Sequence, residues 1–324
     1  MSVEPGADDG SNDGPNGGGQ GAQQEEAPAS GGQHGMALSF GFGTDRGLRR
    51  ELNEDSFLAA DPIFAVADGM GGHEAGEVAS RECISVLSQQ TVLAAGSRGA
   101  TAVDLQQALR QADSRIREIC HARAGTTVTG VVLVEERGVP YWLVFNVGDS
   151  RTYRLSQGSF GQVSVDHSEV QELVDGGLIT PAEALVHPRR HVVTRALGTG
   201  PDTEADYWLV PVEDGDRILV CSDGLTGEVS DEGIHRALIT LPHPQDVVDS
   251  LIQAALRSGG RDNVTVVVVD ASHVDGTAPE TMTKPFALTA EGETRPRVPG
   301  NGTEQAEPPA PAHETTIPHE ENHG

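Results

Sequence analysis

The sequence predicts an α+β fold: an α-β-β-α sandwich of two packed, mostly antiparallel sheets flanked by helices. Two observations support this. Short apolar runs typical of strands recur along the chain, and between them lie longer segments whose apolar residues repeat every three or four positions. Strands flanked by such amphipathic helices bury their apolar faces in packed layers.

Four apolar runs predict strands, and each adjoins an aspartate. Three of them end at Asp68, Asp149 and Asp223, and the fourth begins after Asp262. The runs are residues 63–67, 142–147, 217–221 and 264–269. In an antiparallel sheet the end of one strand lies beside the start of its neighbour. We therefore expect the four carboxylates to meet on one rim.

The helices follow from apolar stripes and capping residues. One stripe consists of Leu105, Leu109, Ala112, Ile116 and Ile119. A second stripe, within residues 247–256, follows Pro244, which suits the first turn of a helix. A third, short helix is expected after Thr180, where Thr-Pro-Ala-Glu forms a capping box.

The two ends of the chain differ from its centre in composition. Residues 1–36 contain ten Gly, three Pro, six acidic residues and no Lys or Arg, and residues 273–324 contain eight Pro. Such segments bury too little apolar surface to offset the entropy of ordering, so we expect two disordered tails. The remaining residues, 37–272, form one expected domain.

Charge and hydropathy exclude several classes of partner. The net charge of −27 disfavours nucleic acid and anionic membrane surfaces as partners. No apolar run reaches the length of a membrane span, and the first residues lack the basic and apolar regions of a signal peptide. Three cysteines without a Cys-x-x-Cys pair argue against a disulfide framework. We expect a cytoplasmic protein without membrane or nucleic-acid partners.

The clustered aspartates predict a site for hard divalent cations. Carboxylate oxygens favour Mg²⁺ or Mn²⁺, whereas zinc sites usually recruit Cys or His, and none of the four motifs pairs these at ligand spacing. A single Asp-Gly is usually only a turn. Four such motifs, each against a strand, indicate a shared metal site.

The ordered set of motifs resembles the bacterial form of the metal-dependent protein phosphatase 2C family. The resemblance covers about residues 38–271. The motifs are Arg50-x-x-Asn53-Glu54-Asp55, Asp68-Gly69-Met70-Gly71-Gly72, Gly125-Thr126-Thr127, Gly148-Asp149-Ser150, Ser222-Asp223-Gly224 and Asp262-Asn263-Val264-Thr265. The resemblance implies a serine/threonine phosphoprotein phosphatase whose attacking water is activated by two metal ions, Mn²⁺ or Mg²⁺. Its partners would be phosphoserine and phosphothreonine proteins and an opposing serine/threonine kinase.

The resemblance also assigns metal ligands. Asp68 would bridge both ions and the Gly69 carbonyl would join it, while Asp223 and Asp262 would complete the first site. Glu54 and Asp55 would act directly or through waters.

Further positions match the family's phosphate and third-metal sites. Arg50 stands where the family places the arginine that grips the substrate phosphate, and its planar guanidinium suits two phosphoryl oxygens. Asp149 resembles the family position that holds a third ion. His191 stands where related enzymes often have a Ser near that ion. The flap of the family corresponds to residues 166–200, which carry Arg189, Arg190 and Arg195.

Two departures keep alternatives open. Met70 stands where animal members usually have a His that is a candidate general acid, so no general acid is assigned. With His191, this favours a second reading, a catalytically degenerate phosphatase fold that binds phosphoproteins or other partners. A third reading is an interaction hub whose acidic tails recruit partners. Intact Asp68, Asp223 and Asp262 favour the enzyme.

Overall fold

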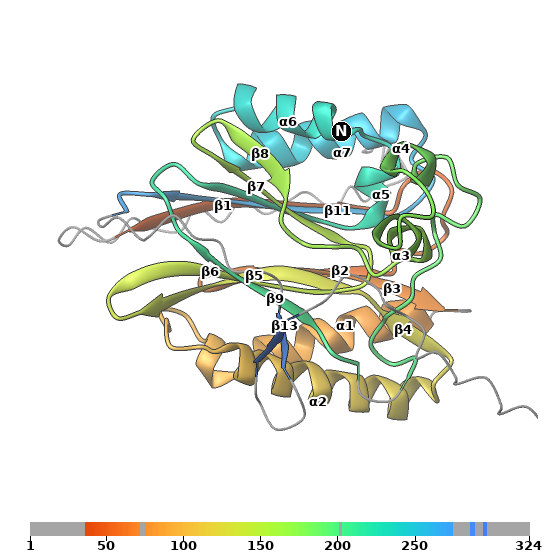
Figure 1. The fold of residues 1–324 in the computed structure, drawn as a ribbon, viewed down its shortest axis with the longest axis horizontal. Coiled ribbons are helices and arrows are strands. Elements are labelled where there is room, and N and C mark those ends of the chain that lie inside the picture. Colours follow the sequence, from red (N-terminus) through yellow and green to blue (C-terminus); the bar gives the residue numbers. More distant parts are fainter. Residues whose placement is uncertain (1–35, 72–74, 201–202, 275–285, 289–293, 297–324) are drawn as a thin grey trace, which may run out of the picture. The chain divides into compact units, whose positions relative to one another are not determined.

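Two antiparallel sheets lie face to face, and helices cover the outer face of each (Figure 1). The computed structural model describes residues 36–71, 75–200, 203–274, 286–288 and 294–296. In order across the first sheet the strands are β1 (Ala37–Asp45), β11 (Val264–Ser272), β10 (Arg217–Cys221), β7 (Arg151–Ser156) and β8 (Ser159–Gln162). The predicted sandwich is confirmed.

The second sheet is larger. In order its strands are β13 (Thr294–Pro296), β12 (Phe286–Leu288), β9 (Asp206–Pro211), β6 (Val139–Val147), β5 (Val128–Glu136), β3 (Ile63–Gly71) and β2 (Asp55–Ala60). The short strand β4 (Ala124–Thr126) pairs with the last residues of β3. The four strands predicted from apolar runs are all present, as β3, β6, β10 and β11.

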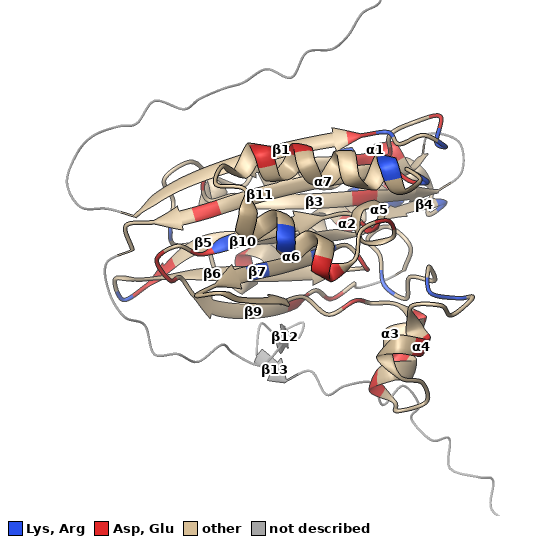
Figure 2. Cartoon of the chain, turned by 90° about the horizontal axis from the view of Figure 1, so that it is seen from above, with Lys and Arg blue, Asp and Glu red and all other residues tan. Residues whose placement is uncertain are grey.

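Two helix pairs form the outer layers. Helices α1 (Ala75–Ser88) and α2 (Ala102–Cys120) lie against the second sheet, with a 3₁₀ turn, η1 (Thr91–Leu93), between them. Helices α6 (Asp231–Thr240) and α7 (Pro244–Ser258) cover the first sheet. The four-residue helix α5 (Asp223–Thr226) directly follows β10. Figure 2 shows α3 (Glu169–Asp175) and α4 (Pro181–Ala184) as a small pair standing off the sheets.

Strand β3 shows why its apolar run is nearly continuous. Phe64 and Val66 face the core between the sheets, whereas Ile63, Ala65 and Ala67 face α1 and α2. A strand covered on both faces has no solvent side on which polar residues would alternate. The strand also continues through Asp68 to Gly71, because Asp68 pairs with Asp55 of β2 and the next residues pair with β4. Asp68 therefore lies within a strand rather than after its end.

The predicted helices are present, with one residue misplaced. Thr101 and Asp104 form a capping box at the start of α2, and Thr180 and Glu183 form the predicted one at α4. Ile119, predicted to be in the α2 stripe, is 48% exposed, and Cys120 is buried in its place. A step of four residues from Ile116 keeps position 120 on the buried face, because the helix has 3.6 residues per turn.

The segment expected to form the C-terminal tail contains β12 and β13, and Phe286 of β12 pairs with Tyr207 of β9. The expected N-terminal tail falls almost wholly outside the described residues, as does most of the C-terminal one. Their lack of structure stays a prediction. Among the helices of the described residues, none has both the length and the apolar character needed to cross a membrane.

Candidate metal centre

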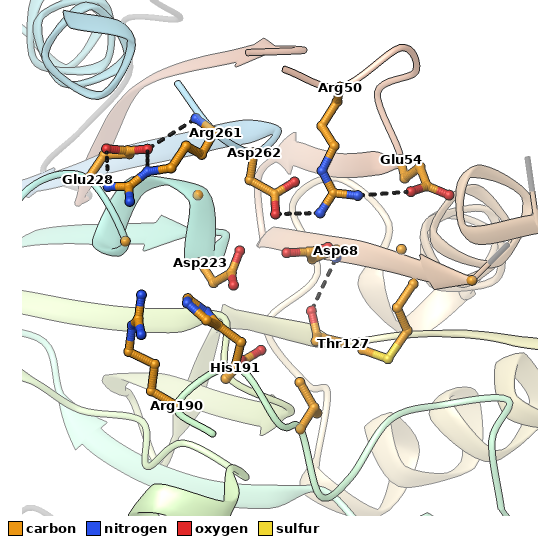
Figure 3. Close-up of a pocket in the computed structure, with 17 residues that line it drawn as sticks. Arg50, Glu54, Asp68, Thr127, Arg190, His191, Asp223, Glu228, Arg261 and Asp262 are labelled. Atoms are coloured by element: carbon orange, nitrogen blue, oxygen red, sulfur yellow. Dashed lines mark hydrogen bonds and ion pairs between the residues drawn. The ribbon is translucent and has the colours of Figure 1, made fainter. Parts of the chain in front are cut away.

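One cavity of about 610 Å³ brings the predicted site residues together (Figure 3). All of them except Asp55 line it. They are Arg50, Glu54, Asp68, Gly69, Asp149, His191, Asp223 and Asp262. In the close-up, the carboxylates of Asp68, Asp223 and Asp262 point toward one shared space. The predicted convergence of the four strand-adjoining aspartates is confirmed, and their roles stay predictions.

Strand pairing places the carboxylates. Asp223 begins α5 at the end of β10, and Asp262 stands two residues before β11, which is the antiparallel neighbour of β10. Across the cavity, Asp68 of β3 pairs with Asp55 of β2. Both sheets therefore contribute to one rim, the first through Asp223 and Asp262 and the second through Asp68.

Asp68 is held by its backbone. Its carbonyl accepts hydrogen bonds from the Thr127 N–H and the Thr126 hydroxyl, both at 2.9 Å, and its N–H donates to Thr127 Oγ1 at 3.2 Å. Thr127 Oγ1 also lies 2.8 Å from Ser150 Oγ, next to Asp149. The Gly-Thr-Thr motif thus ties the turn that carries Asp149 to the strand that carries Asp68. From the sequence this motif had no assigned role.

Gly69 is required by close packing. A Cβ at this position would overlap the carbonyl oxygens of Gly76 in α1 and Glu54. The Gly69 N–H donates to the Glu54 carbonyl at 3.1 Å, and the Ser80 hydroxyl donates to the same carbonyl at 2.5 Å. These contacts fix the backbone of Glu54 beside the cavity.

Asp55 lies behind the cavity wall instead of in it. Its Oδ2 accepts hydrogen bonds from the hydroxyls of Ser222 at 2.8 Å and Thr265 at 2.7 Å. Its Oδ1 is buried and has no hydrogen-bond partner within the described residues. A buried carboxylate oxygen without a donor is costly unless a cation or a water approaches it.

The carboxylates raise one another's proton affinity. Burial raises the pKa of Asp55 to about 7 and that of Asp149 to about 8, and the charge of Asp223 adds to both shifts. Burial, followed by the charge of Asp55, raises the pKa of Asp68 well above its ordinary value. Burial and the charge of Asp262 raise the pKa of Asp223. Such clustered carboxylates are poised to accept positive charge.

The donor set fits hard divalent cations. The converging side chains offer carboxylate oxygens, and Asp55 Oδ1 lacks a partner. No group of three or more His, Cys, Asp or Glu side chains in the described residues is arranged so that it could hold a metal ion by side chains alone. Mg²⁺ usually needs only one or two protein carboxylates, and waters complete its octahedral coordination. The residues present therefore suit Mg²⁺ or Mn²⁺ better than a cation that needs an all-protein cage.

Arg50 reaches the carboxylates from the mouth of the cavity. Its Nη2 donates to Asp262 Oδ2 at 2.6 Å, and its Nη1 lies 3.9 Å from Glu54 Oε2. The hydrogen bond to Asp262 raises the pKa of the guanidinium, although the side chain is 47% exposed. The neighbouring Arg49 is exposed and is not among the residues that line the cavity. Only Arg50 of the pair can meet a ligand there.

The flap supplies the opposite wall. His191 and Arg190 line the cavity from this segment, and Met70 lines it from β3. Arg189 instead pairs with Glu169 at 2.6 Å, and Arg195 with Asp206 at 3.3 Å. Of the three flap arginines noted in the sequence, Arg190 is the one that reaches the cavity.

Glu228 and Arg261 also line the cavity, and no sequence motif selects them. They lie 33 residues apart and form an ion pair, with Arg261 Nε 2.8 Å from Glu228 Oε1. Only the position of Arg261 directly before Asp262 hinted at the site.

A family model described as protein phosphatase 2C matches residues 43–259. The chain belongs to the protein phosphatase 2C family. Among known members, the serine/threonine protein phosphatase PstP of Mycobacterium tuberculosis is 42% identical over 245 residues, which are 74% of this chain and 46% of that protein. The present family member thus spans about half the length of its M. tuberculosis relatives. The serine/threonine phosphatase stp of Listeria innocua is 35% identical over 71% of this chain and 94% of its own length.

Solved structures of the family share this fold. The crystal structure of M. tuberculosis PstP/Ppp has a TM-score of 0.68 and 40% identity, and covers 73% of this chain and 99% of that one. The catalytic domain of PstP in complex with two manganese ions has a TM-score of 0.66 and 39% identity, over 74% of this chain and all of that one. The architecture predicted from the resemblance is that of these phosphatases.

Proposed function

We propose that this protein is a metal-dependent serine/threonine phosphatase that hydrolyses phosphomonoesters on proteins. The observation that carries the proposal is a single cavity in which buried, proton-attracting carboxylates face the guanidinium of Arg50. Cations held by the carboxylates and a phosphate held by the arginine would meet there. The names of the relatives and the two manganese ions in the PstP structure support the same activity.

Each predicted residue has a role in this proposal. Asp68, Asp223 and Asp262, with the carbonyl of Gly69, would hold two Mn²⁺ or Mg²⁺ ions, and Glu54 and Asp55 would act directly or through waters. Asp149 and His191 would serve a third ion. When bound, the cations would lower the pKa of a water and neutralise phosphoryl oxygens.

Arg50 would bind and orient the substrate phosphate. Its contact with Asp262 leaves the guanidinium at the mouth of the cavity, where a phosphoryl group would enter. A planar guanidinium donates two parallel hydrogen bonds to such a group, which fixes the ester for attack.

The degenerate-fold alternative is disfavoured. It rested on Met70 and His191, and both line the cavity without displacing any of the predicted carboxylates. The relatives bear the names of phosphatases rather than of binding modules.

We further propose that the substrates are phosphoserine and phosphothreonine proteins made by an opposing serine/threonine kinase, within cytoplasmic signalling. The free, buried Cys83, Cys120 and Cys221 suit a reducing compartment. Arg190 on the flap would attract a negatively charged substrate segment to the cavity.

Phosphate release from a phosphothreonine peptide tests the function. We expect turnover with Mn²⁺, none with excess chelator, and recovery when Mn²⁺ is restored. Asp68→Asn should lack activity under all three conditions. Equal phosphate release with and without chelator, or none with Mn²⁺, would refute the proposal.

A further inference from the structure

The carboxylate of Glu228 is engaged entirely by one residue, Arg261. Oε1 accepts hydrogen bonds from the backbone N–H of Arg261 at 3.0 Å and from its Nε at 2.8 Å, and Oε2 accepts from its Nη2 at 3.0 Å (Figure 3). The side chain of Glu228 is only 3% exposed, whereas that of Arg261 is 66% exposed. The buried Glu228 therefore has the fixed position, and its hydrogen bonds hold Arg261 in place.

The backbone of the loop 259–262 adopts a conformation that leaves room for the Glu228 carboxylate. Gly259 and Gly260 have φ angles of 154° and 52°, which side chains rarely adopt. A Cβ on Gly259 would lie 3.1 Å from Glu228 Oε2. On the other side, the Leu48 N–H donates to the Gly260 carbonyl at 2.7 Å, two residues before Arg50. Hydrogen bonds thus hold the loop 259–262 on both sides, to Glu228 after α5 and to Leu48 in the loop that carries Arg50.

Asp262 lies between two anchors. After it, Asn263 donates its N–H to Asp262 Oδ1 at 2.8 Å, and its Nδ2 donates to the carbonyls of Arg46 and Leu52 at 2.9 Å. Before it, the hydrogen bond from the Arg261 N–H to Glu228 fixes the Gly260–Arg261 peptide, which lies one residue before Asp262. A carboxylate ligand must be held in one orientation if it is to bind a cation tightly, since ordering it on binding would cost free energy.

Glu228 is not itself arranged as a metal ligand. Its two oxygens accept three hydrogen bonds from Arg261, and the charge-assisted pair of bonds to the guanidinium satisfies them in a fork-to-fork geometry.

We propose that Glu228 is a positioning residue, which fixes the 259–262 loop so that Asp262 lies beside Asp223 and faces Asp68 across the cavity. The inference rests on the proposed metal-dependent function. Beyond that function, it assigns a structural link between Glu228, at the end of α5, and the proposed ligand Asp262, which stands 34 residues later in the chain.

The test compares Glu228→Ala, Glu228→Gln and Arg261→Ala with the wild type. The matched control is Glu82→Gln, because Glu82 of α1 is a largely buried carboxylate paired with Arg115 of α2 at 2.6 Å, and neither residue lines the cavity. Two quantities are measured. Hydrogen exchange of the peptide spanning 259–263 is followed in chelator, and Mn²⁺ affinity is measured by calorimetry.

In Glu228→Ala we expect the 259–263 amides to exchange at least tenfold faster and Mn²⁺ affinity to fall roughly tenfold, the lower end for groups that orient a ligand. Glu228→Gln should lie between this variant and the wild type, because its amide oxygen still accepts from the Arg261 N–H. Arg261→Ala should also be milder, since its backbone N–H remains bonded. Glu82→Gln should change neither quantity.

Unchanged exchange and affinity in Glu228→Ala would overturn the inference, as would equal changes in Glu82→Gln. If Glu228→Ala does not fold, the nearly isosteric Glu228→Gln tests the inference instead, through the same hydrogen exchange and Mn²⁺ affinity measurements. Loss of Mn²⁺ binding in Glu228→Gln as complete as in Asp262→Asn would make Glu228 a ligand instead. Failure of the wild type to bind Mn²⁺ would refute the proposed function, whereas the exchange experiment would still show whether Glu228 holds the loop.

Discussion

Asp55→Asn should stabilise the metal-free protein while weakening its hold on metal. Burial raises the pKa of Asp55 from 3.8 to about 7, so at about pH 8 the folded protein carries a charge in an unfavourable place. Each pKa unit corresponds to about 1.4 kcal/mol, which puts the cost of that ionised carboxylate at up to ~4 kcal/mol. Burial causes most of this cost, and the charges of Asp223 and Asp262 add to it. A neutral Asn at this position is still a buried polar group, so we expect the substitution to recover about half of the cost, ~2 kcal/mol.

The side chain can be replaced with little change in packing. An Asn oxygen still accepts from Ser222 and Thr265, and its amide group takes the place of Oδ1, which has no partner within the described residues. For a domain of this size ~1 kcal/mol changes Tm by about 2 to 4 °C. Asp55→Asn should therefore raise Tm in chelator by roughly 4 to 8 °C at about pH 8.

The sign of the pH dependence follows from the raised pKa. An acid whose pKa is higher in the folded state favours folding below its unfolded pKa, and that contribution is lost as pH rises through the folded pKa. The wild type in chelator should accordingly lose stability relative to the variant between about pH 4 and about pH 7, and the two should converge near pH 4.

Thermal unfolding followed by circular dichroism, in chelator at about pH 5 and about pH 8, measures this difference. With saturating Mn²⁺ the order should reverse, because only the wild type has the full negative charge of the site. An Asp55→Asn variant that is no more stable than the wild type in chelator at the higher pH would refute the electrostatic reasoning.

Two further predictions concern the cavity itself. Asp223→Asn and Asp262→Asn should each lower Mn²⁺ affinity and reduce turnover by about 10² or more, because each removes the charge of a proposed ligand; near-normal turnover at saturating Mn²⁺ in both would show that the ligands lie elsewhere. Arg50→Ala should lower kcat/KM on a phosphothreonine peptide by roughly ten- to a hundredfold without weakening Mn²⁺ binding, whereas the exposed Arg49→Ala should do little. Equal, small effects at the two arginines would remove Arg50 from phosphate binding.

Local sequence patterns identified much of the fold and of the cavity. Asp223 and Asp262 adjoin strands whose apolar runs are unmistakable, and antiparallel pairing then requires β10 to end where β11 begins. Asp68 was found in the same way, although its strand continues past it, because pairing with Asp55 and β4 extends β3 beyond the apolar residues. An apolar run indicates which residues are buried, but it does not show how far the backbone of a strand continues to pair with its neighbours.

Long-range contacts account for what the sequence did not reveal. The pairing of Glu228 with Arg261 depends on how the end of α5 meets the loop before β11, and no local sequence pattern indicates that the two residues pair. Arg190 lines the cavity, whereas Arg189 and Arg195 form ion pairs with Glu169 and Asp206. This difference depends on which carboxylates lie near each arginine in the folded chain. The position of Asp55 behind the cavity wall depends on two hydroxyls from the first sheet's side of the site, that of Thr265 in β11 and that of Ser222, which directly follows β10.

The position of bound manganese tests the central claim most directly. Crystals grown with Mn²⁺ and measured at the manganese absorption edge would locate the ions by anomalous scattering. We predict two strong peaks in the cavity, with Asp68 contacting both ions and Asp223 and Asp262 contacting one. Peaks only outside the cavity, or none at Mn²⁺ concentrations that support turnover, would contradict the assignment of these carboxylates as the metal site.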